Sequence, residues 1–147
     1  MIEKYVKAST LLGITTQLYS TRMNQILGEQ DLNVSQFFLL NHLLRNQGKR
    51  EGISDLTQAL EMNQPAVTKI VQKLAKLDLV EVKKDEIDSR KKWVSITVEG
   101  QKKIKTSMQS LGPDVANWFE GWSADDLDQL IGHLAKLASW LDENRLR

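Results

Sequence analysis

Cysteine is absent from this 147-residue chain, and histidine occurs only at His42 and His133. Without cysteine the chain forms no disulfide bond, thiolate metal site or thiol-based redox switch. Two histidines do not make a histidine-rich metal site, and we expect no cofactor. No apolar run approaches the roughly 18 residues that cross a bilayer. We therefore expect a cytoplasmic protein with no membrane partner.

Catalytic motifs are missing as well. The sequence holds no nucleophile elbow, phosphate-binding loop or spaced cluster of metal ligands, so we do not expect an enzyme. Hydrophobic residues make up 41% of the chain, which suffices for one compact domain or for a domain with an oligomerisation element.

Charge is distributed unevenly, although the net charge is only +1. Basic and acidic residues balance in residues 1–61, basic residues exceed acidic ones by five in residues 62–105, and they fall short by four in residues 106–147. The basic middle section is where a polyanion would dock. A solvated face without a partner would carry the same excess, so charge alone does not decide.

Residues 2–28 are predicted to form one long helix. Apolar residues recur every seven positions along it, at Tyr5, Leu12, Tyr19 and Ile26. This is more apolar surface than a solvent-facing helix carries. A second helix is predicted to begin with Ser35 as its N-cap and to end at Gly48.

The end of the chain carries a second apolar stripe, along a helix predicted to begin near Ser123. The stripe consists of Leu127, Leu130, Ile131, Leu134, Leu137, Ala138 and Leu141. A preceding helix, capped by Thr97, is predicted to kink or break at Gly112-Pro113. Packing both terminal helices against a second copy would bury both stripes. An intrachain helical core is the alternative.

Residues 53–97 are predicted to contain two short helices joined by a tight turn, followed by a β-hairpin. Ser54 is expected to cap the first helix, and Asn63 the second, which opens with Gln64 and Pro65. Residues at helical spacing on the second helix are expected to face inward: Val67, Ile70, Val71, Leu74 and Leu77.

Polar residues dominate the opposite face of that second helix, which shows Gln64, Ala66, Thr68, Lys69, Gln72, Lys73 and Lys76. A helix fits the major groove of B-DNA, where Gln, Thr and Lys side chains can contact base edges. We then expect Lys73 and Lys76 near phosphates. The wet side of an ordinary amphipathic helix is the alternative.

From Leu79 onward the hydrophobic period changes to two, so Val80, Val82, Val94 and Ile96 are expected to share one buried face of two strands. The polar loop between the strands contains Asp88 and Arg90, which are close enough to pair. An arginine held in this way can enter a minor groove. A disordered tip without a partner is the alternative.

Asp88-Ser89-Arg90, followed by Ile96-Thr97 and then Val98-Glu99-Gly100, resembles the wing signature of the MarR family of bacterial transcription regulators. The resemblance implies a mainly α fold with a small β-hairpin wing (α+β). A winged helix-turn-helix would occupy residues 35–97, and helical dimerisation regions residues 1–34 and 98–147. One departure is Glu61, which stands in the turn where many helix-turn-helix proteins have glycine.

The resemblance also implies a homodimer that binds double-stranded DNA as a sequence-specific transcription regulator, which we expect to be a repressor on a pseudo-palindromic operator. A winged-helix protein-interaction module without sequence-specific DNA binding is the alternative. The residues expected in the major groove are Asn63, Gln64, Pro65, Ala66, Thr68 and Lys69. Those expected near phosphates are Ser54, Gln72, Lys73, Lys76, Lys91 and Lys92. Asp88 and Arg90 are expected at the minor groove.

Members of that family often bind small aromatic or anionic compounds between the dimerisation helices and the DNA-binding lobe. The resemblance therefore implies a small-molecule effector that changes DNA binding. In this chain the pocket would be lined by Thr16, Tyr19, Arg22, Gln36 and His42. Ordinary packing of these five side chains is the alternative.

Overall fold

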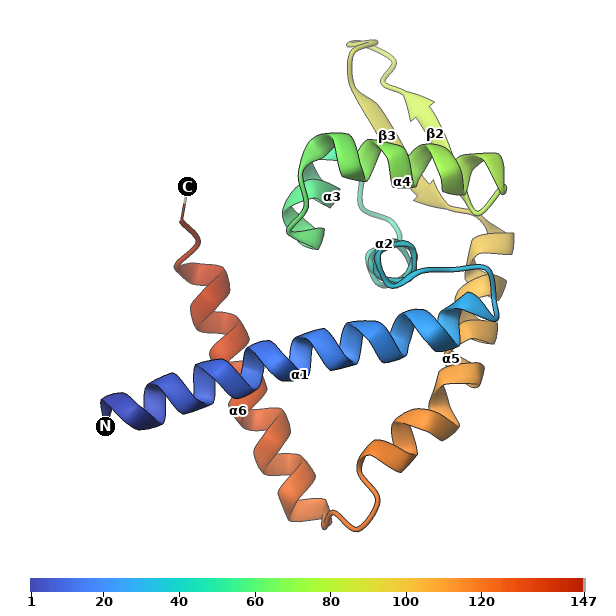
Figure 1. Ribbon diagram of the computed structural model, residues 1–147. Coiled ribbons are helices and arrows are strands. Elements are labelled where there is room, and N and C mark those ends of the chain that lie inside the picture. The colour runs from blue at the N-terminus through green and yellow to red at the C-terminus, as the bar shows by residue number, and fades with distance from the viewer. Residues whose placement is uncertain (147) are drawn as a thin grey trace. The chain divides into compact units, whose positions relative to one another are not determined.

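The computed structural model describes residues 1–146, which form six helices and a small antiparallel sheet (Figure 1). The fold class is the mainly α arrangement with a β-hairpin that the sequence predicts. In chain order the elements are α1 (Ile2–Gly28), α2 (Val34–Arg45), β1 (Glu51–Gly52), α3 (Ile53–Leu60), α4 (Gln64–Lys76), β2 (Val80–Lys84), β3 (Lys92–Ile96), α5 (Val98–Trp118) and α6 (Ala124–Glu143).

The chain divides into two compact units, and the boundary falls between Gly112 and Pro113. Helix α5 continues through this point, so a break of the helix there, one of the two predicted outcomes, is wrong. A proline inside a helix removes one N–H donor and its ring crowds the carbonyl four residues earlier, which bends a helix that continues past it. Among residues 1–146, no helix combines the length and the apolar character that crossing a membrane requires.

A leucine-rich core holds the first unit together. Its fully buried side chains come from five helices, α1 to α5: Leu27, Leu39, Leu40, Leu56, Val67, Leu74 and Ile104. Burying one such side chain contributes about 1.5–3 kcal/mol relative to leaving it in water. This core therefore fixes α3 and α4 against the rest of the unit.

The sheet has the strand order β1-β3-β2, with both pairings antiparallel. Val80 pairs with Ile96 and Val82 with Val94, as a hairpin with one shared face requires. Val80 and Val94 are buried and Ile96 is half-buried, but Val82 is 37% exposed, so the predicted burial of Val82 is wrong. Val82 lies on the edge strand β2, whereas Val94 lies on the central strand.

Helix α2 begins two residues earlier than predicted, with Asn33 rather than Ser35 as its N-cap. The Asn33 side chain accepts a hydrogen bond from the Gln36 N–H at 2.8 Å, and the Gln36 side chain accepts one from the Asn33 N–H at 3.0 Å. This reciprocal capping box needs Gln or Glu three residues after the cap. Ser35 has Phe38 at that position.

Helix α3 is likewise capped by Gly52 and not by Ser54. The Gly52 N–H donates to the Asp55 carboxylate at 2.8 Å, and Ser54 lies exposed in the first turn. The helix ends at Leu60, and its C-cap residue Glu61 has a left-handed backbone with φ 52° and ψ 43°. Glutamate thus adopts the conformation that glycine takes at no steric cost, and the tight turn forms without glycine.

Thr97 and Gly100 connect the start of α5 to the end of α4 and the sheet. The Thr97 hydroxyl donates to the Asp78 carbonyl oxygen at 2.6 Å and accepts from the Gly100 N–H at 3.0 Å, which confirms Thr97 as the cap. A Cβ atom on Gly100 would lie 2.1 Å from the Leu79 carbonyl oxygen. Only glycine permits this close approach of two backbones.

We expect Gly100→Ala to destabilise the fold by about 1–3 kcal/mol, the usual range for overpacking. Urea unfolding followed by circular dichroism measures this change. Gly28→Ala is the matched control, because a Cβ there meets no atom within 4 Å and alanine favours a helix over glycine. Equal stability of the two variants would contradict the close packing around Gly100.

Candidate nucleic-acid interface

Helix α4 is fixed through one side and open on the other. The Asn63 side chain caps it by accepting from the Ala66 N–H at 2.9 Å, as predicted. Val67, Val71 and Leu74 are buried. Leu77 is the C-cap residue and is 49% exposed, so its predicted inward position is wrong.

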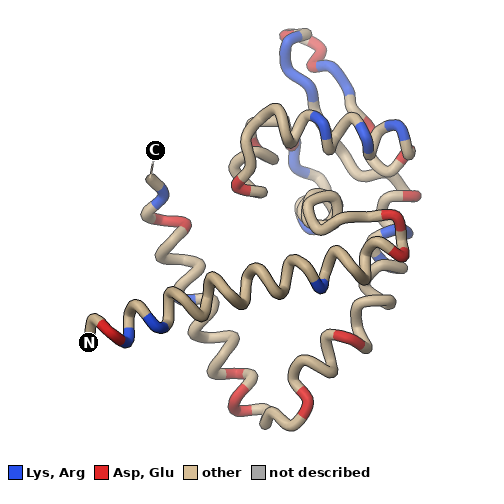
Figure 2. Tube along the Cα trace, viewed as in Figure 1, with Lys and Arg blue, Asp and Glu red and all other residues tan. Residues whose placement is uncertain are grey.

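The residues of the predicted DNA-facing surface lie mainly in solvent. On α4 and its cap, Gln64, Pro65, Lys69, Gln72, Lys73 and the other polar positions are exposed or half-buried, and none is buried. Ser54, Lys91 and Lys92 are also exposed. In Figure 2, basic residues follow both arms of the β2–β3 hairpin and recur along α4. The basic section of the sequence therefore lies on α4, on the hairpin and on the start of α5, all within the first unit.

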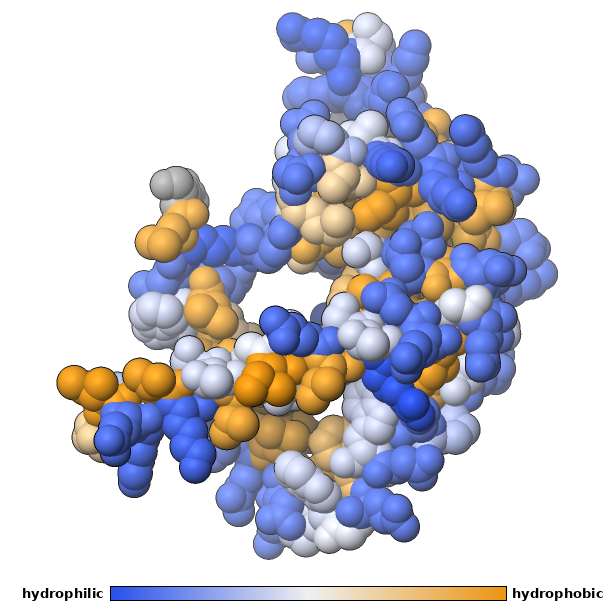
Figure 3. All heavy atoms as spheres, in the orientation of Figure 1, coloured by the Kyte–Doolittle hydropathy of each residue, from blue (hydrophilic) through white to orange (hydrophobic). Residues whose placement is uncertain are grey.

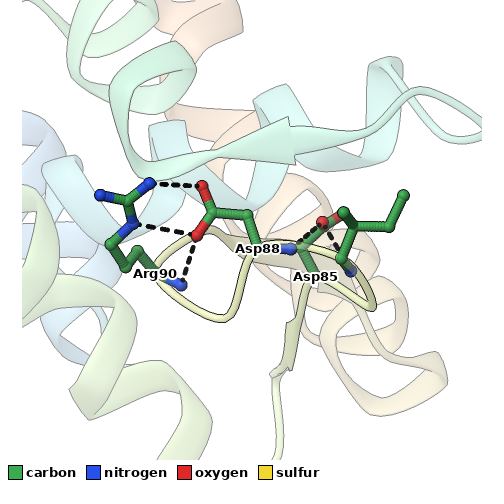
Figure 4. A network of polar contacts seen from close by, with 4 residues as sticks. Asp85, Asp88 and Arg90 are labelled. Carbon is green, nitrogen blue, oxygen red and sulfur yellow. Dashed lines mark hydrogen bonds and ion pairs between the residues drawn. The ribbon is translucent and has the colours of Figure 1, made fainter.

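The β2–β3 hairpin is here called the wing, and hydrogen bonds organise its tip, residues 85–91 (Figure 4). Arg90 donates from Nε to Asp88 Oδ1 at 3.0 Å and from Nη2 to Oδ2 at 3.2 Å, so the predicted pair is present. The Arg90 backbone N–H also donates to Asp88 Oδ1, at 3.1 Å. These bonds from Arg90 lower the pKa of Asp88. The guanidinium is held in one direction while 90% of its side chain remains exposed.

Asp85, which sequence reasoning did not single out, is the most connected residue of the wing. Its Oδ2 accepts from the N–H groups of Ile87 at 3.1 Å and Asp88 at 2.9 Å. Its Oδ1 accepts from the Trp93 indole N–H at 2.9 Å and lies 3.4 Å from Arg50 Nη1. The bond from the Asp88 backbone is the largest of the causes that lower the pKa of Asp85 to about 2.

Only part of this network has a signal in the sequence. Aspartate often forms turns in which its side chain accepts from backbone N–H groups two or three residues further along. The bonds to Ile87 and Asp88 could therefore have been predicted from the local sequence. The partners Trp93 and Arg50 lie 8 and 35 residues away. The Arg50 guanidinium also stacks over the Trp93 ring, 5.3 Å from its centroid.

The residues predicted to line an effector pocket lie on α1 (Thr16, Tyr19 and Arg22) and on α2 (Gln36 and His42). Burial raises the pKa of the Tyr19 phenol. The Gln36 amide is part of the α2 capping box, and His42 Nε2 lies 3.2 Å from Glu51 Oε1. His42 also lines an open pocket of about 240 Å³ together with residues of α2 and α3. An effector site at these residues stays a prediction.

Two helices joined by a tight turn and followed by a two-stranded wing define a winged helix-turn-helix protein. Residues 21–107, more than half of the chain, match the family described as transcriptional regulator SarA/Rot. The chain therefore belongs to the SarA/Rot family and is a MarR-type winged-helix, DNA-binding transcription regulator. A sequence comparison with curated proteins gives no match.

Solved structures share the fold at low sequence identity. The regulator BldR from Sulfolobus solfataricus is 21% identical, with a TM-score of 0.82 over 94% of this chain and 96% of that one. A point mutant of Escherichia coli MarR complexed with operator DNA is 20% identical, with a TM-score of 0.77 over 93% and 97%. Bordetella bronchiseptica BpsR, described in connection with regulation of DNA binding by 6-hydroxynicotinic acid, is 23% identical, with a TM-score of 0.77 over 90% and 98%.

The lowered pKa of Asp85 gives a test of the wing network. A folded-state pKa of about 2 lies below the ordinary 3.8, so the bonds to the carboxylate stabilise the wing above 3.8 and are lost as the pH falls through about 2. Trp93→Phe removes one donor and should move the pKa of Asp85 part of the way back to 3.8. Carbon-detected NMR of the carboxyl group measures it.

Trp140→Phe is the control for this titration, since Trp140 lies on α6 in the second unit. It should leave the Asp85 titration unchanged. An Asp85 carboxyl that titrates near 3.8 in the unsubstituted protein would contradict the network.

Proposed function

We propose that the protein is a homodimeric repressor that binds a pseudo-palindromic operator, with α4 in the major groove and the wing in the minor groove. The observation that carries the proposal is the state of Arg90, which is exposed at the tip and held by two side-chain bonds to Asp88. A minor groove concentrates negative potential and attracts an arginine presented in this way. The MarR structure with operator DNA and a Staphylococcus aureus MepR mutant bound to an oligodeoxyribonucleotide support DNA as the partner.

The surface of α4 supports a division of roles within the major groove. Gln64 and Lys69 are exposed near the start of the helix, where side chains reach base edges in helix-turn-helix proteins. Lys73 and Lys76 follow in its last turn, and Lys91 and Lys92 lie at the wing. We assign these four lysines to phosphates, and in the same proposal Ser54 and Gln72 approach the backbone as polar donors.

Exposed apolar surface on the terminal helices supports the homodimer. Helix α1 exposes Tyr5, Leu11, Ile14 and Leu18, and its apolar residues form a band in Figure 3. Helix α6 has no buried residue within its described range and exposes Ile131, Leu134, Leu137, Trp140 and Leu141. Apolar surface of this extent on both terminal helices is typical of an interaction site. A two-fold dimer would place the two α4 helices about one DNA turn, roughly 34 Å, apart.

Arg90→Ala and Lys73→Ala test the DNA-binding proposal because each should reduce DNA binding in a different way. Removing Lys73 should weaken binding to all duplexes alike and flatten the dependence on salt by about one counterion. Removing Arg90 should also reduce the preference for sites with a narrow, A·T-rich minor groove. Footprint titrations at several salt concentrations on a duplex selected by the unsubstituted protein separate these effects. Equal affinity of that protein for every duplex would instead support a protein-interaction module.

Ile131→Glu tests the dimer. The side chain is 63% exposed, so a charge there should leave the fold of one copy intact while it disrupts an apolar interface. We expect a monomer in sedimentation velocity and a loss of operator binding. Lys136→Glu, on the same helix and also exposed, is the control and should stay dimeric. A monomeric unsubstituted protein would contradict the proposal.

A further inference from the structure

Asp85 joins segments that lie far apart in the chain. It follows directly after β2, while Trp93 lies within β3 and Arg50 immediately precedes β1. Its carboxylate contacts both of these residues, and its side chain is 14% exposed where that of Arg50 is 71% exposed. The acidic side chain is therefore built into the base of the wing, although most of its neighbours in the loop are in solvent.

The two carboxylate oxygens of Asp85 have different partners. Oδ1 is directed to the sheet, where it accepts from the Trp93 indole. Oδ2 is directed to the tip, where it accepts from the backbone of Ile87 and Asp88 (Figure 4). A carboxylate can accept on both oxygens at once, whereas a carboxamide has only one accepting oxygen. An asparagine here would lose one of the two attachments.

The residue that orients the wing arginine is itself held by Asp85. The Asp88 N–H donates to Asp85, and the Asp88 carboxylate then accepts from Nε and Nη2 of Arg90. A continuous series of hydrogen bonds thus runs from Trp93 through Asp85 and Asp88 to Arg90. Asp85 is ionised at neutral pH, as any carboxyl group with a pKa at or below 3.8 is, so both of its oxygens can accept; the lowered pKa reflects the bonds that the charged form receives.

We propose that Asp85 is a positioning residue for DNA binding, which fixes the tip of the wing to the sheet so that Asp88 presents Arg90 in one direction. The inference rests on the proposed insertion of the wing into a minor groove. Asp85 itself does not contact the nucleic acid. Its contribution is preorganisation, because an arginine already held in the bound direction loses less conformational freedom on binding.

The loss of a negative charge and the loss of positioning should change DNA affinity in opposite directions when Asp85 is replaced by asparagine. Removing any carboxylate from a surface that faces a polyanion favours binding, because the local positive field increases. Glu86 is the adjacent acid, is exposed, and makes no hydrogen bond within the described residues. Glu86→Gln therefore reports the charge effect alone. Asp85→Asn removes the same charge and also one attachment of the tip.

The experiment compares affinities for one duplex, selected by the unsubstituted protein from a random library, by fluorescence anisotropy. Glu86→Gln should bind as tightly as that protein or more tightly. Asp85→Asn should bind about tenfold more weakly, within the range for losing one groove contact. In a protein that already carries Arg90→Ala, adding Asp85→Asn should reduce the affinity little further, because both changes remove the contact of the oriented Arg90 with DNA.

The inference is overturned if Asp85→Asn binds the duplex as tightly as Glu86→Gln does. It is also overturned if the double variant loses as much binding free energy as the two single variants, Asp85→Asn and Arg90→Ala, lose together. A protein that selects no duplex would instead refute the proposed function. Hydrogen exchange at the Ile87 and Asp88 amides and at the Trp93 indole N–H then decides whether Asp85 joins the tip to the sheet, since faster exchange at either end in Asp85→Asn supports that role and unchanged exchange at both refutes it. If Asp85→Asn does not fold, Trp93→Phe removes one bond of the series and should weaken binding in the same direction.

Discussion

Burial of one side of α4 is the constraint on which the rest of the winged helix-turn-helix depends. Val67, Val71 and Leu74 lie in the core, and Asn63 closes the first turn through a bond to the Ala66 N–H. A helix held through these positions has no freedom to rotate about its axis, because rotation would expose the buried side chains. Its opposite face is then permanently open, and that face carries Gln64 and Lys69.

The wing depends on a different kind of constraint, because its tip buries almost no apolar surface. Hydrogen bonds to two carboxylates replace packing there, one at Asp85 and one at Asp88. Such bonds fix direction more than they add stability, because each has a preferred geometry and water competes for the same groups at an exposed tip. The result is an exposed arginine with a defined orientation, which suits recognition of an anionic groove.

Sequence patterns predicted what depends on neighbours in the chain. The helical period of α4 as far as Leu74, the burial of Val80 and Val94, and the Asp88–Arg90 pair all follow local patterns, and the structure confirms each of them. The predicted N-cap of α2 was wrong because a side chain three residues further along selects the cap. Gln36 completes a capping box with Asn33, and Ser35 has no such partner.

Non-local contacts had no such signal. Strand β1 has two residues, too few for any alternation, and it is identified only by its pairing with β3. Val82 fits the alternation but lies on the edge strand, which no pattern within the hairpin reveals. The contacts of Asp85 with Trp93 and Arg50 likewise require the folded sheet. The local half of the site was therefore predictable, and the interactions that hold it in place were not.

The most direct measurement for the central claim is a hydroxyl-radical footprint on a duplex that the protein selects from a random library. A homodimer bound through α4 and the wing should give two protected segments, related by two-fold symmetry and centred about one DNA turn apart, with additional minor-groove protection from the wings. Protection of a single segment, or selection of no preferred sequence, would contradict this claim.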